Sequence, residues 1–183
     1  MSIRLFMGPM FSGKTTKLLV RYGEGPRCVA VKPSVDGRYG AGIIKSHDGY
    51  FIAAKEITDL SAWAMASVPI DTEVVLVDEG QFVKNLAAGC VALAKMGLEV
   101  CVAALNGTSE NSAWSEISAL IPWCTEIVHL SASKCGVCGR SDAGAPFTKY
   151  VGAAHKDGDV AIGGQDLYSP SCAKCVFKTQ TLK

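Results

Sequence analysis

The sequence has no run of about 18 apolar residues, so we expect no membrane-spanning helix and no membrane partner. It also lacks an excess of either charge, because 18 basic residues stand against 17 acidic ones. This balance argues against a basic stripe that follows a nucleic-acid backbone, so nucleic acid is not an expected partner. The opening residues Met1–Phe6 lack the pattern of a secretory signal. The chain is therefore expected in the cytoplasm.

A reducing compartment changes how the 8 cysteines are interpreted. A disulfide scaffold is not expected there, and metal binding or plain burial is the natural interpretation. Cys28, Cys90, Cys101 and Cys124 stand in apolar surroundings, which is typical of buried small side chains.

The sequence contains enough apolar residues for one sizeable core, because 49% of its 183 residues are hydrophobic. Short apolar runs fit buried parallel strands, at Ile3–Met7, Cys28–Lys32, Val74–Val77, Val100–Ala104 and Ile127–Leu130. Between them lie helix-compatible stretches, at Lys14–Tyr22, Asp59–Ala66 and Asn85–Met96. This alternation predicts an α/β fold, with a mostly parallel sheet and helices on both faces.

Two segments interrupt the alternation. Gly42–Ser46 and Tyr50–Ala54 look extended around a tight turn at 47–49, which predicts a hairpin. After Leu130 the helical periodicity disappears, and Cys, Gly and Lys become frequent. We therefore expect an α/β domain over residues 1–131 and a small domain over residues 132–183, which needs a staple because its core is small.

A phosphate-binding loop follows the first strand. Residues 8–15 match G-x-x-x-x-G-K-[ST] at every fixed position, as Gly8, Pro9, Met10, Phe11, Ser12, Gly13, Lys14 and Thr15. Backbone N–H groups of such a loop cradle the phosphates of ATP, the lysine reaches the β- and γ-phosphates, and the threonine hydroxyl binds Mg²⁺. The preceding strand and following helix argue against a chance match, and the fold class is therefore a P-loop NTPase of RecA-like type.

An acidic pair ends the third apolar run. Asp78 follows Val74–Val77 and would orient Mg²⁺, through a water molecule in our interpretation. Glu79 comes next, and it has three possible roles: a base that deprotonates a substrate hydroxyl, a group that positions water for ATP hydrolysis, or a structural residue.

The scarcity of arginine bears on the acceptor. The five arginines are Arg4, Arg21, Arg27, Arg38 and Arg140. A nucleoside monophosphate kinase holds an anionic acceptor with several arginine forks, so a neutral acceptor with a free hydroxyl fits this chain better. Arg38 is the candidate for contacting the transferred phosphate, and a solvated surface arginine is the alternative.

Two Cys-x-x-Cys pairs mark the C-terminal segment, and their members are Cys135, Cys138, Cys172 and Cys175. This pattern predicts a four-thiolate zinc site, which is structural because no position remains open for catalysis. Unrelated pairs and a redox role are the alternatives. The connection of residues 139–171, which we call the lasso, must leave the metal and return to it. It would cover a substrate and exclude water.

Taken together, these motifs resemble the type II (cytosolic, zinc-containing) thymidine kinases over nearly the whole chain. The resemblance rests on the phosphate loop and on motifs at residues 36–39, 46–49, 78–82, 104–108, 147–149 and 162–168. It implies that ATP phosphorylates the 5′-hydroxyl of thymidine and of deoxyuridine, with Glu79 as the base. It also implies a homotetramer that is inhibited by its end product, thymidine triphosphate.

The resemblance assigns further residues. Asp36, Arg38 and Gln81 join the phosphate loop and Asp78 in the ATP-Mg²⁺ site. The nucleoside would be held by Met10, Phe82, Leu105, Trp114, Thr148, Ile162, Gly163 and Tyr168. The chain departs from the family pattern at Ser109, where an aromatic residue is usual, and at Trp114, which stands at a phenylalanine position. The alternatives are a different P-loop phosphotransferase such as a nucleoside monophosphate kinase, and a zinc-ribbon ATPase that depends on nucleic acid.

Overall fold

The computed structural model describes residues 1–37, 40–152, 163–164 and 166–180. Its centre is a six-stranded sheet in which every pair of neighbours is parallel. In spatial order its strands are β5 (Lys55–Ile57), β2 (Cys28–Pro33), β6 (Val74–Val77), β7 (Glu99–Leu105), β1 (Ser2–Gly8) and β8 (Glu126–His129). The sheet confirms the predicted α/β class.

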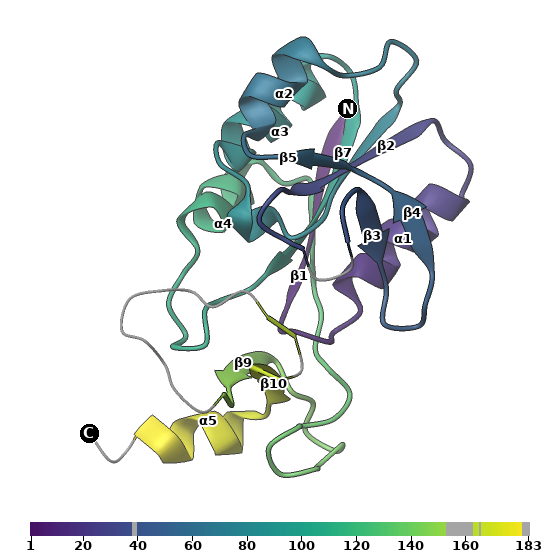
Figure 1. Ribbon diagram of the computed structural model, residues 1–183. Coiled ribbons are helices and arrows are strands. Elements are labelled where there is room, and N and C mark those ends of the chain that lie inside the picture. The colour runs from purple at the N-terminus through teal and green to yellow at the C-terminus, as the bar shows by residue number, and fades with distance from the viewer. Residues whose placement is uncertain (38–39, 153–162, 165, 181–183) are drawn as a thin grey trace.

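Helices cover both faces of this sheet (Figure 1). One face carries α2 (Leu60–Ala66), α3 (Leu86–Lys95) and α4 (Ser115–Leu120). Their buried side chains, such as Leu60, Leu93 and Leu120, form one core cluster with the strands. The opposite face carries α1 (Lys14–Gly23), whose Leu18 is fully buried in a second cluster. All four residues of β6 are buried because they lie between these two layers.

The strand order creates a crevice at the carboxyl ends of the strands. From β1 the chain passes through α1 to β2, whereas from β7 it passes through α4 to β8 on the other side of β1. Where successive connections leave in opposite directions, a crevice opens beyond the strand ends, and ligands bind there in open α/β sheets. The phosphate loop lies directly at this end of β1.

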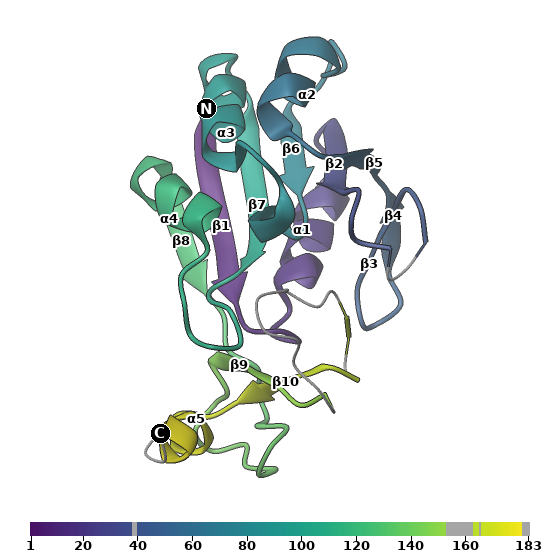
Figure 2. The ribbon, with the colours of Figure 1, turned by 60° about the vertical axis from the view of Figure 1, so that its left-hand side comes forward.

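The predicted hairpin is present. Strands β3 (Ile43–Lys45) and β4 (Phe51–Ala53) pair antiparallel, and the Ser46 N–H donates to the Tyr50 carbonyl at 2.8 Å. Ile44 anchors the hairpin because its side chain is buried in the same cluster as Leu18 of α1. The hairpin therefore packs on the α1 face of the sheet (Figure 2).

A smaller unit lies beyond the carboxyl end of the sheet (Figures 1 and 2). It contains a two-stranded antiparallel sheet of β9 (Phe147–Tyr150) and β10 (Tyr168–Ser171), followed by α5 (Ala173–Gln180). The Leu130 N–H donates to the Met7 carbonyl at 2.7 Å just before this unit begins. The division into domains at residue 131 stays a prediction.

Two sequence predictions need correction. The run Ile127–Leu130 was expected to be a buried strand, but β8 is an edge strand of the sheet and Ile127 is 43% exposed. The loss of helical periodicity after Leu130 predicted no helix, yet α5 follows directly on Cys172. Its first turn is fixed by backbone N–H groups of Cys175 and Val176, which both donate to the Cys172 carbonyl. Local geometry at the cysteines starts this helix.

Candidate active site and metal centre

The phosphate loop wraps the carboxyl end of β1. Gly8, the last residue of β1, is level with Leu105 at the end of β7. A Cβ on Gly8 would lie 2.5 Å from the Leu130 carbonyl oxygen, so only glycine fits there. Phe11 and Gly13 both have positive φ, of 63° and 84°, and helix α1 begins at the next residue, Lys14. These conformations turn backbone N–H groups inward, as an anion-binding loop requires.

Lys14 and Thr15 meet the end of β6 from this loop. The Lys14 side chain is buried, and its Nζ donates to the Pro9 carbonyl at 2.6 Å across the loop. The Thr15 hydroxyl donates to Asp78, with Oγ1 at 3.2 Å from Oδ1 and 3.4 Å from Oδ2. The structure thus brings together two motif residues that are 63 positions apart in the sequence.

Glu79 occupies an unusual backbone conformation. Its φ of 50° and ψ of 43° lie in the left-handed region, which costs free energy for a residue with a Cβ and is concentrated at functional sites. The 3₁₀ turn η1 (Gly80–Phe82) follows at once. A Cβ on Gly80 would lie 2.7 Å from Cγ1 of Val102, so the turn can press against β7 only with glycine there. The chain therefore reverses sharply after Asp78, and both carboxylates line one cleft.

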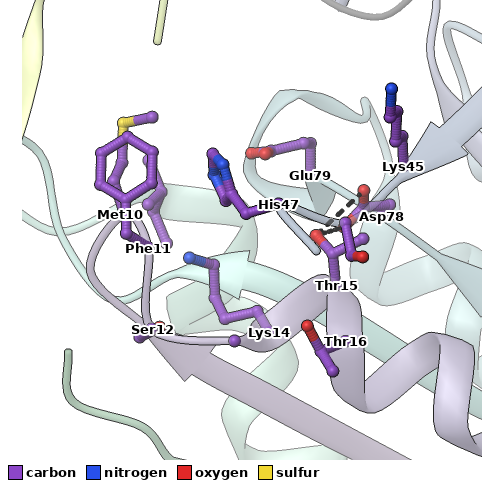
Figure 3. A pocket seen from close by; sticks show the side chains of 13 residues that line it. Met10, Phe11, Ser12, Lys14, Thr15, Thr16, Lys45, His47, Asp78 and Glu79 are labelled. Atoms are coloured by element: carbon purple, nitrogen blue, oxygen red, sulfur yellow. Dashed lines mark hydrogen bonds between the residues drawn. The ribbon is translucent and has the colours of Figure 1, made fainter. Parts of the chain in front are cut away.

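The cleft collects most of the predicted ATP residues (Figure 3). It is lined by Met10, Phe11, Ser12, Gly13, Lys14, Thr15, Thr16, Lys45, Ser46, His47, Asp78, Glu79 and Leu105. Gly8 and Pro9 belong to the loop but are not among the lining residues. In the figure, His47 and Glu79 face the space above Lys14.

Sequence reasoning missed the contribution of the hairpin. Lys45, Ser46 and His47 line the cleft, and the His47 ring lies 4.6 Å from the ring of Phe11 in the phosphate loop. Only the position of the turn in three dimensions brings these residues to the crevice. Residues 46–49 are among the motifs that carry the family resemblance, but that resemblance assigned no role to Lys45, Ser46 or His47.

Asp36 lies outside this cleft, at the start of the segment that leads to the hairpin. Its carboxylate pairs with Lys32 at 3.8 Å, and both side chains are almost fully buried. The Lys32 ammonium also donates to the carbonyls of Gly40 and Ile43, at 3.3 and 3.2 Å. Burial of a lysine is costly unless it is paired, so these three contacts fix the base of the hairpin to β2. Arg38 lies outside the described residues.

Gln81 lies next to the cleft, with its side chain buried against the protein. Its Nε2 donates to Oε2 of Glu79 at 2.6 Å, and its Oε1 accepts from the Leu105 N–H at 3.0 Å. The amide therefore connects the turn after β6 to the end of β7. Its predicted contact with ATP stays a prediction.

Aromatic residues line the other side of the β7 end. Phe82 and Trp114 meet edge to face, with ring centroids 5.4 Å apart, and Trp114 packs against the main core cluster. The indole Nε1 of Trp114 is buried and has no hydrogen-bond partner among the described residues. Ser109 lies half-buried in the loop between β7 and α4.

The small unit contacts the phosphate loop directly. The Met10 N–H donates to Oγ1 of Thr148 in β9 at 3.2 Å, and Thr148 is buried. Asn106, just after β7, donates to the Pro146 carbonyl at 3.0 Å. Tyr168 is buried in β10, with its ring 5.5 Å from that of Tyr150.

Two further lasso residues were predicted to hold the nucleoside. Gly163 is described, and a Cβ there would lie 2.4 Å from Cδ1 of Leu167. Ile162 lies outside the described residues. The residues that line the cleft of the phosphate loop do not include Phe82, Trp114, Thr148, Gly163 or Tyr168.

Four cysteines of the small unit come together as their spacing predicted. The sulfur atoms of Cys135, Cys138, Cys172 and Cys175 all lie within 4.8 Å of one another. Glycines shape the first pair: a Cβ on Gly136 would collide with Oγ of Ser169, and Gly139 has a φ of 75°. Burial opposes charge on the Cys135 thiol, but backbone N–H donors, that of Cys172 first among them, hold its pKa below the usual range. Such a thiol readily becomes the thiolate that a metal binds.

The remaining cysteines differ from this cluster. Cys90 and Cys101 are fully buried, and Cys28 and Cys124 are half-buried. Burial raises the pKa of the Cys101 thiol to about 12 and that of the Cys124 thiol to about 11. These thiols stay protonated near neutral pH and act as small apolar side chains.

Among the described residues, no helix is long and apolar enough to span a membrane.

Comparison with known proteins connects this geometry to one family. A family model described as thymidine kinase matches residues 1–176. The thymidine kinase of Monkeypox virus is 38% identical over 177 residues, which cover 94% of this chain and 95% of the viral protein. The thymidine kinase of Rabbit fibroma virus is 38% identical over 179 residues, which cover 96% of this chain and 96% of the viral protein. That of Raccoon poxvirus is 36% identical over 177 residues, which cover 94% of this chain and 95% of the viral protein.

Proposed function

The chain belongs to the thymidine kinase family, and on that premise we propose that it transfers the γ-phosphate of ATP to the 5′-hydroxyl of thymidine, and also of deoxyuridine. The products are the nucleoside monophosphate and ADP. The observation that carries this proposal is the position of Glu79, whose carboxylate faces the phosphate-loop cleft from a left-handed turn beside Asp78.

Glu79 acts as the general base in this reaction. It accepts the proton of the 5′-hydroxyl while the 5′-oxygen bonds to the γ-phosphorus, and the bond from that phosphorus to the bridging oxygen of ADP breaks. Lys14 and the backbone N–H groups of residues 8–15 hold the phosphates and offset their charge as it redistributes. Asp36, Arg38 and Gln81 are proposed to complete the ATP site.

A magnesium ion fits the oxygens present. Mg²⁺ binds oxygen ligands at about 2.1 Å in octahedral geometry, which places neighbouring ligands about 3.0 Å apart. The 3.2 Å between Thr15 Oγ1 and Asp78 Oδ1 is close to that spacing. We propose that Thr15 binds Mg²⁺ and that Asp78 holds it directly or through water. When bound, the ion neutralises phosphate charge.

A zinc ion fits the cysteine cluster in the same way. Zn²⁺ binds thiolates at about 2.3 Å, so the sulfurs of a tetrahedral site lie about 3.8 Å apart. The sulfurs of Cys138 and Cys172 are 3.8 Å apart. Four thiolates fill such a site, and we propose that the ion is structural and holds the ends of the lasso together.

The nucleoside is proposed to bind between the two units. The described residues proposed to surround it are Met10, Phe82, Leu105, Trp114, Thr148, Gly163 and Tyr168, with Ile162 from the rest of the lasso. The contact of Met10 with Thr148 and the position of Leu105 on the cleft support this arrangement, because they join the phosphate loop to both sides of the proposed pocket. Family membership favours this acceptor over a nucleoside monophosphate or a nucleic-acid-stimulated ATPase.

The decisive experiment measures transfer from γ-labelled ATP to thymidine, deoxyuridine, deoxycytidine and thymidine monophosphate, with and without DNA. Phosphorylated thymidine is the expected product. The Glu79→Gln variant should lose about 10²- to 10⁴-fold in kcat, because the base is removed. ATP should still bind, since the phosphate loop is unchanged.

The matched control is Glu24→Gln, which removes an exposed carboxylate at the end of α1 and should leave kcat unchanged. Full turnover by Glu79→Gln would remove Glu79 from the mechanism. DNA-stimulated ATP hydrolysis without transfer to any nucleoside would overturn the proposed function itself.

Three finer properties belong to the same proposal: a homotetramer, inhibition by thymidine triphosphate and a cytoplasmic location. Exposed apolar side chains support self-association: Ile127 lies on edge strand β8, and Ile121 and Trp123 lie in the 3₁₀ turn η2 (Ile121–Trp123). Light scattering coupled to gel filtration would measure the assembly, and inhibition kinetics with thymidine triphosphate would test the regulation.

A further inference from the structure

A buried glutamine lies between the proposed base and the proposed nucleoside pocket. Gln81 is only 6% exposed, and both ends of its amide are engaged by the protein. Nε2 donates to Oε2 of Glu79 at 2.6 Å, and Oε1 accepts from the backbone N–H of Leu105 at 3.0 Å. The side chain thus spans from the turn after β6 to the last residue of β7.

The two partners dictate the orientation of the amide. The Leu105 N–H can only donate, so it must meet the amide oxygen, and an ionised Glu79 can only accept, so it must meet the amide nitrogen. An amide is the side chain that offers a donor and an acceptor from one planar group at this length. A carboxylate would satisfy Leu105 but would place a second negative charge against Glu79.

The position of Gln81 follows from the turn. Glu79 adopts left-handed geometry and Gly80 presses against Val102, so the next side chain in the 3₁₀ turn is directed back toward the strand ends. A glutamate side chain has several rotatable bonds, and ordering it costs conformational entropy. A short hydrogen bond from a buried amide holds one arrangement of those bonds.

We propose that Gln81 is a positioning residue for the phosphoryl transfer: it holds the Glu79 carboxylate at the acceptor hydroxyl and ties that orientation to the backbone of Leu105. This inference rests on the proposed function of Glu79. It gives Gln81 a role in the chemical step besides its proposed place in the ATP site. Contacts that the nucleoside makes with Leu105 are transmitted to the base through two hydrogen bonds.

Two variants test the proposal by steady-state kinetics. Gln81→Met keeps the length of the side chain but removes donor and acceptor, and it should lower kcat about 10²-fold, the effect expected of a misplaced catalytic group. The KM for ATP should change far less than kcat, because both ends of the Gln81 amide bond to the protein. A KM that rises as much as kcat falls would support the ATP-site role instead. Thermal unfolding of each variant shows whether it is folded.

Gln81→Glu gives the sharper result. The introduced carboxylate can still accept from the Leu105 N–H, but it cannot donate to Glu79 and places a second negative charge against it. We therefore expect kcat to fall at least as far as in Gln81→Met. A merely structural role predicts instead that Gln81→Glu, which keeps the bond to Leu105, retains more activity than Gln81→Met.

The outcomes separate this proposal from the function on which it rests. Wild-type transfer to thymidine with an unchanged kcat in Gln81→Met, or a kcat in Gln81→Glu above that of Gln81→Met, overturns the positioning role and leaves the function standing. A wild-type chain that transfers no phosphate overturns the function. In that event there is no transfer for Gln81 to assist, and crystal structures of wild type and Gln81→Met decide only whether the hydrogen bond orients Glu79: a displaced carboxylate supports this, and an unmoved one refutes it.

Discussion

The ATP side of the molecule and the cysteine-bearing unit are built by different means. The phosphate loop and Asp78 stand at the ends of strands whose side chains are buried on both faces, so burial of a large apolar area fixes them. Among the described residues of the small unit, the core cluster consists of four buried hydrophobic residues, and two of them are cysteines of the proposed zinc site. A sheet supports one side, and the proposed zinc ion would support the other.

This difference predicts how the stability and activity of each side respond to mutation. A mutation in the sheet removes a small part of the contacts of a large cooperative core. A mutation at a metal ligand removes the interaction on which the folding of a small unit mainly depends. The bonds from Met10 to Thr148 and from Asn106 to the Pro146 carbonyl join the two sides. Stability and activity should therefore separate when the two sides are perturbed in turn.

The largest effect is expected from loss of a cysteine ligand. Cys172→Ser should abolish zinc binding and lower thymidine phosphorylation beyond detection, because apparent zinc affinities of about 10–16 kcal/mol are folding free energy for such units. The six-stranded sheet should remain, as measured by circular dichroism, and so should ATP binding. Cys124→Ser is the control, since a serine hydroxyl can keep the bond to the Leu120 carbonyl. Retained zinc and activity in Cys172→Ser would contradict the comparison.

A core truncation should act in the opposite way. Leu76 is fully buried in β6, and Leu76→Ala should lower the free energy of unfolding by about 2–5 kcal/mol, measured by urea denaturation. Zinc content should not change, because the cysteines are not touched. Met65→Ala is the matched control, since Met65 is 85% exposed and should change stability by less than about 0.5 kcal/mol. Zinc release by Leu76→Ala would show that the two sides unfold as one.

The smallest effect concerns an ion pair at the amino end of the sheet. Arg21 donates to both carboxylate oxygens of Glu99, at 3.1 and 2.8 Å, and these bonds lower the pKa of Glu99. A lowered pKa stabilises the fold above the unfolded-state value of about 4.3, and that stabilisation is lost as the pH falls through the folded-state pKa. Glu99→Gln should therefore reduce stability at neutral pH and approach wild type in acid.

Denaturation curves at several pH values measure this difference. Glu126→Gln is the control, because Glu126 is half-exposed on β8 and its pair with Arg4 is screened by solvent. If the loss of stability in Glu99→Gln persists unchanged to about pH 2, packing and not charge accounts for that loss.

The sequence predicted those elements whose formation depends on burial between two layers. The strands at Val74–Val77 and Glu99–Leu105 appear as continuous apolar runs because both of their faces are covered. The start of α2 was also within reach, since the predicted helix at Asp59–Ala66 begins at Asp59, whose side chain accepts from the Ala62 N–H at 2.9 Å. Short elements were missed: β5 has three residues and α4 has six, too few for a periodic signal.

The site residues also fall into those that a local motif predicts and those that only the tertiary structure places. Thr15 and Asp78 belong to motifs whose spacing is imposed by phosphate and metal chemistry, so their meeting was expected, and the structure brings them to 3.2 Å. His47 reaches the cleft through the path of a hairpin, and Lys32 acts through a buried contact with backbone carbonyls. The motif at residues 46–49 marks His47 but assigns it no role, and the contacts of both residues depend on tertiary placement. The assigned roles of the site residues remain predictions.

The hydrogen bond from Met10 to Thr148 has a thermodynamic consequence. Met10 is part of the loop proposed to hold the phosphate donor, and Thr148 belongs to the unit proposed to cover the acceptor. If occupation of one site strengthens this bond, it must raise affinity at the other, and linkage requires the same factor in both directions. The two substrates would then bind with positive cooperativity, and a single buried N–H group would carry part of the coupling free energy between them.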